Sequence, residues 1–210
     1  MNTQANVMPQ NKKKMGVQAI TQIGMLSAIA TVLMLFEIPL PFAPSFYEID
    51  LSEVPVLVGC FVMGPAAGAI IELVKVLLNL VINGTLTAGV GEFGNFLIGC
   101  SFVVPAGILY HRIRSKKGAV IGMILGTACM TVFGCFINAY LLLPTYAKAF
   151  QMPMDALIGM GTAVNPSIDS LMTFVLFAVA PFNLLKGALV STVVLLIYKK
   201  ISPIFKLHQR

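Results

Sequence analysis

Charged side chains are scarce in this sequence. Asp, Glu, Lys and Arg make up 10% of its 210 residues, whereas hydrophobic residues make up 58%, and the mean hydropathy is +0.90. A soluble globular domain carries charge at about a quarter of its positions. The composition therefore excludes an ordinary soluble domain, and it predicts an all-α integral membrane protein.

Residues that support metal, redox or nucleotide chemistry are also few. The sequence has two histidines, His111 and His208, both beside basic residues, so no zinc or iron site is expected. Its four cysteines lie in apolar runs without a Cys-x-x-Cys spacing, which predicts packing residues rather than disulfides or metal ligands. A Walker-type phosphate loop is absent, so any energy for transport must come from another protein.

Hydropathy divides the chain into six apolar blocks, which predict six transmembrane helices. The second block has ten residues and reaches only about half of the hydrocarbon thickness, so it must pack against its neighbours. We expect an N-terminal tail (1–15), a six-helix membrane domain (16–200) with an uncleaved first helix, and a C-terminal tail (201–210). The blocks span residues 17–36, 54–63, 66–82, 95–110, 118–143 and 170–198.

Basic residues are concentrated in the connections that an inside N-terminus would place in the cytoplasm. Lysines 12–14, the segment 111–117 and the end of the chain hold most of them, whereas the other connections hold most of the acids. Cytoplasmic loops of membrane proteins are enriched in Lys and Arg, so both termini are expected in the cytoplasm. The net charge of +6 is therefore a topology signal and not a nucleic-acid site.

The last block contains two polar residues, Asn183 and Lys186, one turn apart on the same helical face. A lysine in the middle of a membrane helix costs about 2.5–3.5 kcal/mol on insertion scales, and such residues face a cavity, a partner or a ligand. The block has no acid of its own, so Lys186 is expected to lack an acidic partner. Its donors and the Asn183 amide suit a flat heteroaromatic ligand.

Other polar residues of the blocks have a structural alternative. Glu72 and Lys75 are spaced as an ion pair within one helix, with Asn79 on the same face as a helix–helix contact. For Asn138, in the fifth block, packing between helices and ligand contact are equally compatible with the sequence. Pro181 is expected to disturb its helix just before Asn183.

Two further segments have the composition of binding surfaces. The first loop, residues 37–53, combines three prolines with Phe42, Phe46 and Tyr47, which suits a stiff cover with stacking surfaces better than a plain connector. In the first block, Gly24, Ser27, Ala28 and Thr31 form a stripe of small residues. Such stripes permit close packing of helices, either within the chain or against another membrane subunit.

Several of these segments together resemble one family. The runs IDLSEVP, FINAYLLLPTYAKAF and APFNLLKG are similar to the substrate-binding S components of energy-coupling factor (ECF) vitamin transporters, within these to the riboflavin-specific RibU type. The resemblance covers about residues 25–200. It implies a six-helix bundle in the bacterial plasma membrane that binds riboflavin from outside. Riboflavin would be the transported substrate and not a cofactor, and acceptance of FMN stays open.

The resemblance also implies roles for particular residues. Asn138, Asn183 and Lys186 would hold the isoalloxazine ring, and Phe46, Tyr47 and Asp50 would cover it. Gly24, Ser27 and Ala28 would dock onto a transmembrane coupling protein, which works with two cytoplasmic ATPases. The alternatives are an S component for thiamine, biotin or pantothenate, and a membrane scaffold that binds no small molecule; an intramembrane enzyme fits poorly, because these helices lack the residues for one.

Overall fold

The structure is a computed structural model that describes residues 16–41, 44, 46–85 and 87–207. The lysine run of the N-terminal tail and Phe42 lie outside the described residues. Helices account for nearly all regular structure, with one two-stranded ribbon. In chain order the elements are α1 (Val17–Met34), β1 (Ile38–Pro39), β2 (Glu48–Ile49), α2 (Glu53–Met63), α3 (Pro65–Asn83), α4 (Val90–Ile113), α5 (Lys116–Ile137), η1 (Asn138–Leu142), α6 (Leu143–Ala149), α7 (Met154–Thr162), α8 (Leu171–Phe174), η2 (Val175–Val179) and α9 (Ala180–Leu207).

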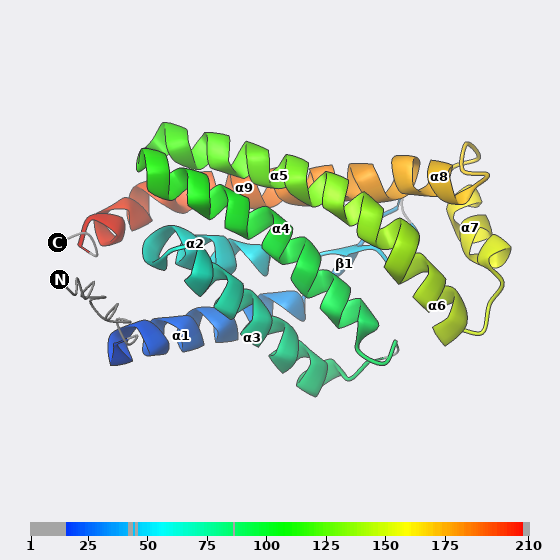
Figure 1. The fold of residues 1–210 in the computed structure, drawn as a ribbon, viewed down its shortest axis with the longest axis horizontal. Coiled ribbons are helices and arrows are strands. Elements are labelled where there is room, and N and C mark those ends of the chain that lie inside the picture. The colour runs from blue at the N-terminus through cyan, green and yellow to red at the C-terminus, as the bar shows by residue number, and fades with distance from the viewer. Residues whose placement is uncertain (1–15, 42–43, 45, 86, 208–210) are drawn as a thin grey trace, which may run out of the picture.

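The long helices lie roughly side by side in an elongated bundle (Figure 1). The start of α1, the α2–α3 junction, the α4–α5 junction and the end of α9 lie at one end of it, at the left of the view. The ribbon and the connection from α6 through α7 to α8 lie toward the other end. The chain thus crosses the length of the bundle an even number of times. Below, the end with α6 and α7 is called the distal end.

Within the described residues, five helical segments are long and apolar enough to cross a membrane: Val17–Met34, Pro65–Asn83, Val90–Ile113, Lys116–Ala149 and Leu171–Tyr198. The prediction of an all-α membrane protein is confirmed, with five candidate spans among the described residues. The remaining apolar helix, α2, has 11 residues and coincides with the short second block. By length, α2 is not a full span.

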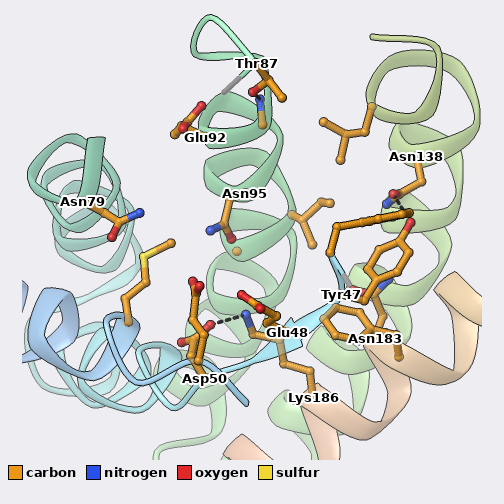
Figure 2. A pocket seen from close by; sticks show the side chains of 18 of the residues that line it. Tyr47, Glu48, Asp50, Asn79, Thr87, Glu92, Asn95, Asn138, Asn183 and Lys186 are labelled. Carbon is orange, nitrogen blue, oxygen red and sulfur yellow. Dashed lines mark hydrogen bonds and ion pairs between the residues drawn. The ribbon is translucent and has the colours of Figure 1, made fainter. Parts of the chain in front are cut away.

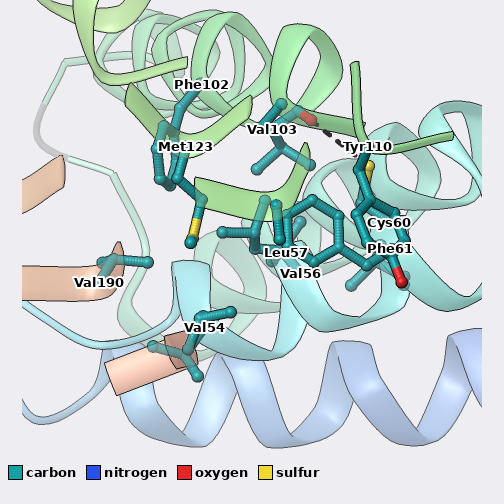
Figure 3. Packing of buried hydrophobic residues seen from close by; sticks show 14 of the residues in the cluster. Val54, Val56, Leu57, Cys60, Phe61, Phe102, Val103, Tyr110, Met123 and Val190 are labelled. Carbon is teal, nitrogen blue, oxygen red and sulfur yellow. Dashed lines mark hydrogen bonds between the residues drawn. The ribbon is translucent and has the colours of Figure 1, made fainter. Parts of the chain in front are cut away.

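The short helix α2 lies at the centre of the bundle, where it contacts α1, α3, α4 and α9. Most of its residues are buried, and its other apolar side chains, Val58, Val62 and Met63, are half-buried, as expected of a helix with little solvent-facing surface. Val56, Leu57 and Phe61 pack with Phe102 and Val103 of α4 (Figure 3). The neighbours therefore enclose the helix that is too short to span on its own.

The break between α2 and α3 falls at Gly64 and Pro65, as the sequence predicts. Gly64 has a φ of +107°, a conformation that residues with a Cβ rarely adopt. Pro65 is the first residue of α3, where its missing N–H would have no partner in the helix anyway. These two residues reverse the chain between two packed helices.

Two π-helical segments interrupt the long helices, and each precedes a proline. A proline ring clashes with the carbonyl of the residue four positions earlier, which is Tyr140 for Pro144 and Phe177 for Pro181. Those two residues lie inside η1 and η2, where the wider turn relieves the clash. The disturbance expected at Pro181 is thus present, whereas the one at Pro144 was not anticipated.

Several block boundaries differ from the structure. α4 begins at Val90 rather than near Asn95, the fifth block continues through η1 into α6, and α9 continues to Leu207. The segment after Pro153, expected to be a connection, contains α7. The first loop contains the antiparallel pair of β1 and β2, with Ile38 opposite Ile49. Hydropathy detects only the apolar middle of a helix. It therefore missed these extensions, whose residues are polar or rich in glycine.

Candidate functional site

A cavity of about 470 Å³ opens in the distal half of the bundle. The first loop, the starts of α2 and α4, the end of α3, η1, α6 and the first turns of α9 line it. Its size lies within the range of small-molecule sites, about 300–1,000 Å³. Figure 2 shows polar side chains from the first loop, α3, α4, η1 and α9 around one space. All six residues expected to contact a ligand line it: Phe46, Tyr47, Asp50, Asn138, Asn183 and Lys186.

Asn138 lies at the start of η1 and is 2% exposed. Its amide nitrogen donates to the carbonyl of Gly134, one turn earlier, at 2.8 Å. Its Oδ1 accepts a hydrogen bond of 2.7 Å from the hydroxyl of Tyr47 in the first loop. The backbone contact fixes the amide, and the amide in turn anchors the loop.

Asn183 lies in the second turn of the α9 segment, just after η2. Its amide nitrogen donates to the carbonyl of Val179 at 3.0 Å, which leaves its Oδ1 for a donor from the cavity. Opposite it on α5 is Gly134, where a Cβ would lie 2.8 Å from the Asn183 nitrogen. Because Gly134 has no side chain, the Asn183 amide fits between α5 and α9.

Lys186 does have an acidic partner, so the expectation that it lacks one is wrong. Its Nζ lies 2.9 Å from Oδ2 of Asp50, which follows β2. Helical spacing could not reveal this contact, because 136 residues separate the two. Burial acts to raise the pKa of Asp50, but the ammonium groups of Lys186 and, beyond it, Lys75 outweigh burial and hold that pKa below its ordinary value.

The first loop contributes an aromatic surface. The ring centroids of Phe46 and Tyr47 are 4.8 Å apart, and Tyr47 lies 5.1 Å from Phe182 of α9. Tyr146 of α6 meets Phe46 edge-on at 6.0 Å. Burial raises the pKa of Tyr47 well above its ordinary value, so its hydroxyl stays a neutral donor. This cluster gives one side of the cavity apolar faces beside the polar groups.

The expected ion pair of Glu72 and Lys75 is confirmed at 2.7 Å, and it has a third member. Glu53, which was assigned to an outside loop, begins α2 and places its Oε1 2.9 Å from Lys75 Nζ. All three are buried, and Gly99 of α4 makes room for them: a Cβ there would lie 2.7 Å from the Glu72 carboxyl carbon. Lys75 is thus neutralised inside the bundle and is not free to bind a ligand.

Four more polar residues line the cavity from α3 and α4: Asn79, Asn83, Glu92 and Asn95. None of these four residues was expected from the sequence to contact a ligand, and Asn79 was expected to contact another helix. They flank the α3–α4 connection at the distal ends of both helices. Buried amide side chains need hydrogen-bond partners. The three asparagines near the ends of these two apolar helices could therefore have indicated a binding site from the sequence.

The residues expected to dock a partner subunit lie on different faces of α1. Ser27 is fully buried and donates to the carbonyl of Ile23, so it is not available at the surface. Gly24 and Ala28 are exposed, and nothing lies within 4 Å of a Cβ built at Gly24. The exposed part of the stripe is therefore Gly24 and Ala28 alone.

The arrangement is suited to holding a ligand rather than transforming one. Fixed amides, an ammonium and aromatic faces surround the cavity, and the described residues include no cluster of three potential metal ligands. The two lysines nearby, Lys75 and Lys186, are each paired with acids. Binding is the chemistry that these groups support.

Comparison with known proteins identifies the family. Residues 18–198 match the family model described as "ECF transporter, substrate-specific component". The chain belongs to this family. An ECF substrate-specific component is a multi-pass membrane subunit of a bacterial transporter and not an enzyme.

Related proteins of this ECF family are similar over nearly their whole length. The chain is 35% identical over 190 residues to "Riboflavin transporter FmnP" of Bacillus subtilis (strain 168), covering 90% of this chain and 94% of that protein. It is 36% identical to "Riboflavin transporter RibU" of Staphylococcus aureus (strain TCH60), covering 95% of each. A solved structure described as the S component of a bacterial ECF transporter superposes with a TM-score of 0.70 at 35% identity, covering 90% of this chain and 98% of that one.

Proposed function

We propose that this chain is the riboflavin-binding S component of an ECF importer, which captures riboflavin outside the cell for delivery to the cytoplasm. The observation that carries the proposal is the polar clamp, defined as Asn138, Asn183 and Lys186, which faces one cavity from two helices. Relatives described as riboflavin transporters support it. Riboflavin is then cargo, and the subunit needs no cofactor.

The clamp matches the edge of a flavin ring. The pyrimidine edge of isoalloxazine carries two carbonyl acceptors and an N–H donor between them. Lys186 donates only, and an asparagine amide both donates and accepts, so the clamp complements this pattern. Phe46, Tyr47 and Phe182 add apolar area for the ring faces, worth roughly 25 cal/mol per Å² buried.

The first loop covers this site in our proposal. Tyr47 and Asp50 hydrogen-bond to Asn138 and Lys186, and therefore connect the loop directly to the clamp. A ligand that binds the clamp must share or replace these two contacts. Ligand binding and the position of the loop are then coupled.

We propose the same topology as the sequence indicates, with six passes and cytoplasmic termini, and α2 as the short sixth pass. The end of the bundle opposite the cavity carries Arg112, Arg114, Lys116 and Lys117 at the α4–α5 junction. Cytoplasmic ends of membrane proteins are enriched in such residues. The cavity consequently opens toward the outside.

We further propose that the subunit works with a transmembrane coupling protein and two cytoplasmic ATPases. Gly24 and Ala28 form an exposed strip on α1 where a partner helix can approach closely. ATP hydrolysis then takes place in the partner subunits.

Binding measurements on purified protein test the function. Wild-type protein is expected to quench riboflavin fluorescence, and Asn183→Ala or Lys186→Ala to weaken binding by about 1–3 kcal/mol per lost buried hydrogen bond. Asn165→Ala, in the α7–α8 connection outside the cavity, is the matched control. Unchanged affinity in folded clamp variants would refute the clamp; binding of thiamine, biotin or pantothenate instead, or of no vitamin, would refute the function.

A further inference from the structure

The aromatic surface of the first loop packs against a residue outside the cavity, Phe174. The ring of Phe174 is fully buried and does not line the cavity. It is nearly parallel to the ring of Phe46, at 7°, with centroids 6.4 Å apart, and its centroid lies 6.3 Å from that of Tyr47. Both loop residues line the cavity. Phe174 therefore reaches the site through these two rings.

The start of the last membrane helix fixes the position of Phe174. At the start of α8 the Ser170 side chain accepts from the backbone N–H of Thr173, and the Thr173 side chain accepts from that of Ser170, which is a capping box. The backbone N–H of Phe174 donates to the carbonyl of Ser170 at 2.9 Å. Phe174 thus belongs to a capped helix start, whereas its partners Phe46 and Tyr47 belong to a loop.

Helix α7 closes the other side of the ring. A Cβ at Gly161 would lie 2.7 Å from Phe174 Cδ2 and 2.8 Å from Cε2, so only a glycine allows α7 to approach this closely. Leu157 and Ile168 are each 1% exposed and belong to the same buried cluster. Because protein cores are close-packed, the ring has little room to move away from the loop.

The same two loop rings connect to the polar clamp. Tyr47 donates to Asn138 at 2.7 Å, and its ring lies 5.1 Å from Phe182, the residue before Asn183. The ring of Phe46 lies 4.8 Å from that of Tyr47. Support for these rings is consequently support for the part of the loop that contacts the clamp.

We infer that Phe174, backed by Gly161, is a positioning residue that holds the first loop over the ligand and thereby slows ligand release. This inference rests on the proposed function, in which the ligand is riboflavin and the loop covers it. Release then requires the loop to lift, which separates Phe46 and Tyr47 from Phe174. Entry takes place while the loop is lifted, so the support acts on release and not on entry.

The test measures both rates on the purified full chain by flavin fluorescence after rapid mixing. Phe174→Leu keeps an apolar side chain but removes the ring. It is expected to release riboflavin roughly two- to twelvefold faster, the effect of one lost aromatic pair, with association within about twofold of wild type. Phe61→Leu makes the same change at a buried position of α2 outside the cavity, and both of its rates should stay within about twofold.

A double-mutant cycle tests whether Phe174 acts through the loop. Phe46→Ala removes one partner ring, so Phe174→Leu should accelerate release by a smaller factor in that background than in wild type. A general loss of stability would not depend on Phe46 in this way. Independent effects of the two substitutions would contradict the role of Phe174.

A second variant leaves Phe174 itself unchanged. Gly161→Ala brings a Cβ against the ring and is expected to displace it and accelerate release. Gly159→Ala, on the same helix, is the matched control, because nothing lies within 4 Å of a Cβ there. Wild-type release rates in folded Phe174→Leu or Gly161→Ala, or equal acceleration in the controls, would overturn the inference. Wild-type protein that binds no riboflavin would instead overturn the proposed function.

Discussion

Among the described residues, Lys75 and Lys186 are buried inside the bundle, and their surroundings distinguish a structural role from a binding role. Lys75 is fully buried between two acids, Glu72 of its own helix α3 and Glu53 of the adjacent helix α2. Lys186 lines the cavity, and among the described residues it forms an ion pair with one acid, Asp50 of the first loop. A charge held by two fixed acids stabilises the packing, whereas one held by a loop acid can exchange its partner for a ligand.

The first prediction concerns Lys75. Lys75→Met would leave two carboxylates buried without a counter-charge, so we expect it to lower the free energy of unfolding by about 3–5 kcal/mol. The four free cysteines allow a thiol-reactive dye to follow thermal unfolding. Lys148→Met at an exposed position is the control and should change stability by about 0.5 kcal/mol or less. Equal unfolding temperatures for the two variants would contradict the role of Lys75.

The residues of the site differ in how far the sequence could predict them. Asn183 and Lys186 lie one turn apart in an apolar run, so spacing alone puts them on one face, and Lys186 stands out by its insertion cost. Asp50 and Glu53 could not be assigned in the same way. Their partners are 136 and 22 residues away, and only the packing of different elements brings them together.

The helices and strands also differ in how far the sequence could predict them. Apolar length predicted the long helices and the short α2, because the bilayer fixes how many apolar residues a helix needs. It did not predict α7, the ribbon or η1, where polar residues and local backbone geometry decide the structure. The site lies among these irregular elements, since η1, η2 and the ribbon position Asn138, Asn183 and Asp50.

The ribbon is expected to respond to pH through Glu37, which precedes β1. Burial raises the pKa of Glu37 from 4.5 to about 7, together with a hydrogen bond that protonated Glu37 donates to Glu48 and repulsion between the two carboxylates. Asp50 adds to this rise and Lys186 opposes it. A carboxyl whose pKa is raised in the formed ribbon stabilises it fully below pH 4.5, and this contribution is lost as the pH rises through about 7.

Riboflavin release measures this effect, because the first loop lines the cavity and in our proposal covers it. The dissociation rate followed by flavin fluorescence is expected to increase as the pH rises through about 7. Glu37→Gln keeps a neutral hydrogen-bonding group and should release riboflavin at a rate that no longer depends on pH in this range. A variant with the wild-type pH profile would show that another group controls release.

At the scale of the whole molecule, the two ends of the bundle have separate tasks. The cavity and its loop lie at the distal end, whereas the helix junctions with basic residues lie at the other (Figure 1). α1 lies along one side of the bundle (Figure 1), and its exposed residues Gly24 and Ala28 do not line the cavity. A partner on this face of α1 would therefore leave the ligand site untouched.

The last prediction separates binding from transport on this basis. Ala28→Leu adds bulk to the exposed strip of α1, where overpacking costs about 1–3 kcal/mol, so assembly with the coupling protein should weaken by roughly five- to 150-fold. Riboflavin affinity of the isolated subunit should stay unchanged, while uptake by cells falls. Ala128→Leu makes the same change at an exposed position of α5 and should preserve both. Normal uptake with Ala28→Leu would place the coupling protein on another face, whereas loss of riboflavin binding would show that α1 supports the site itself.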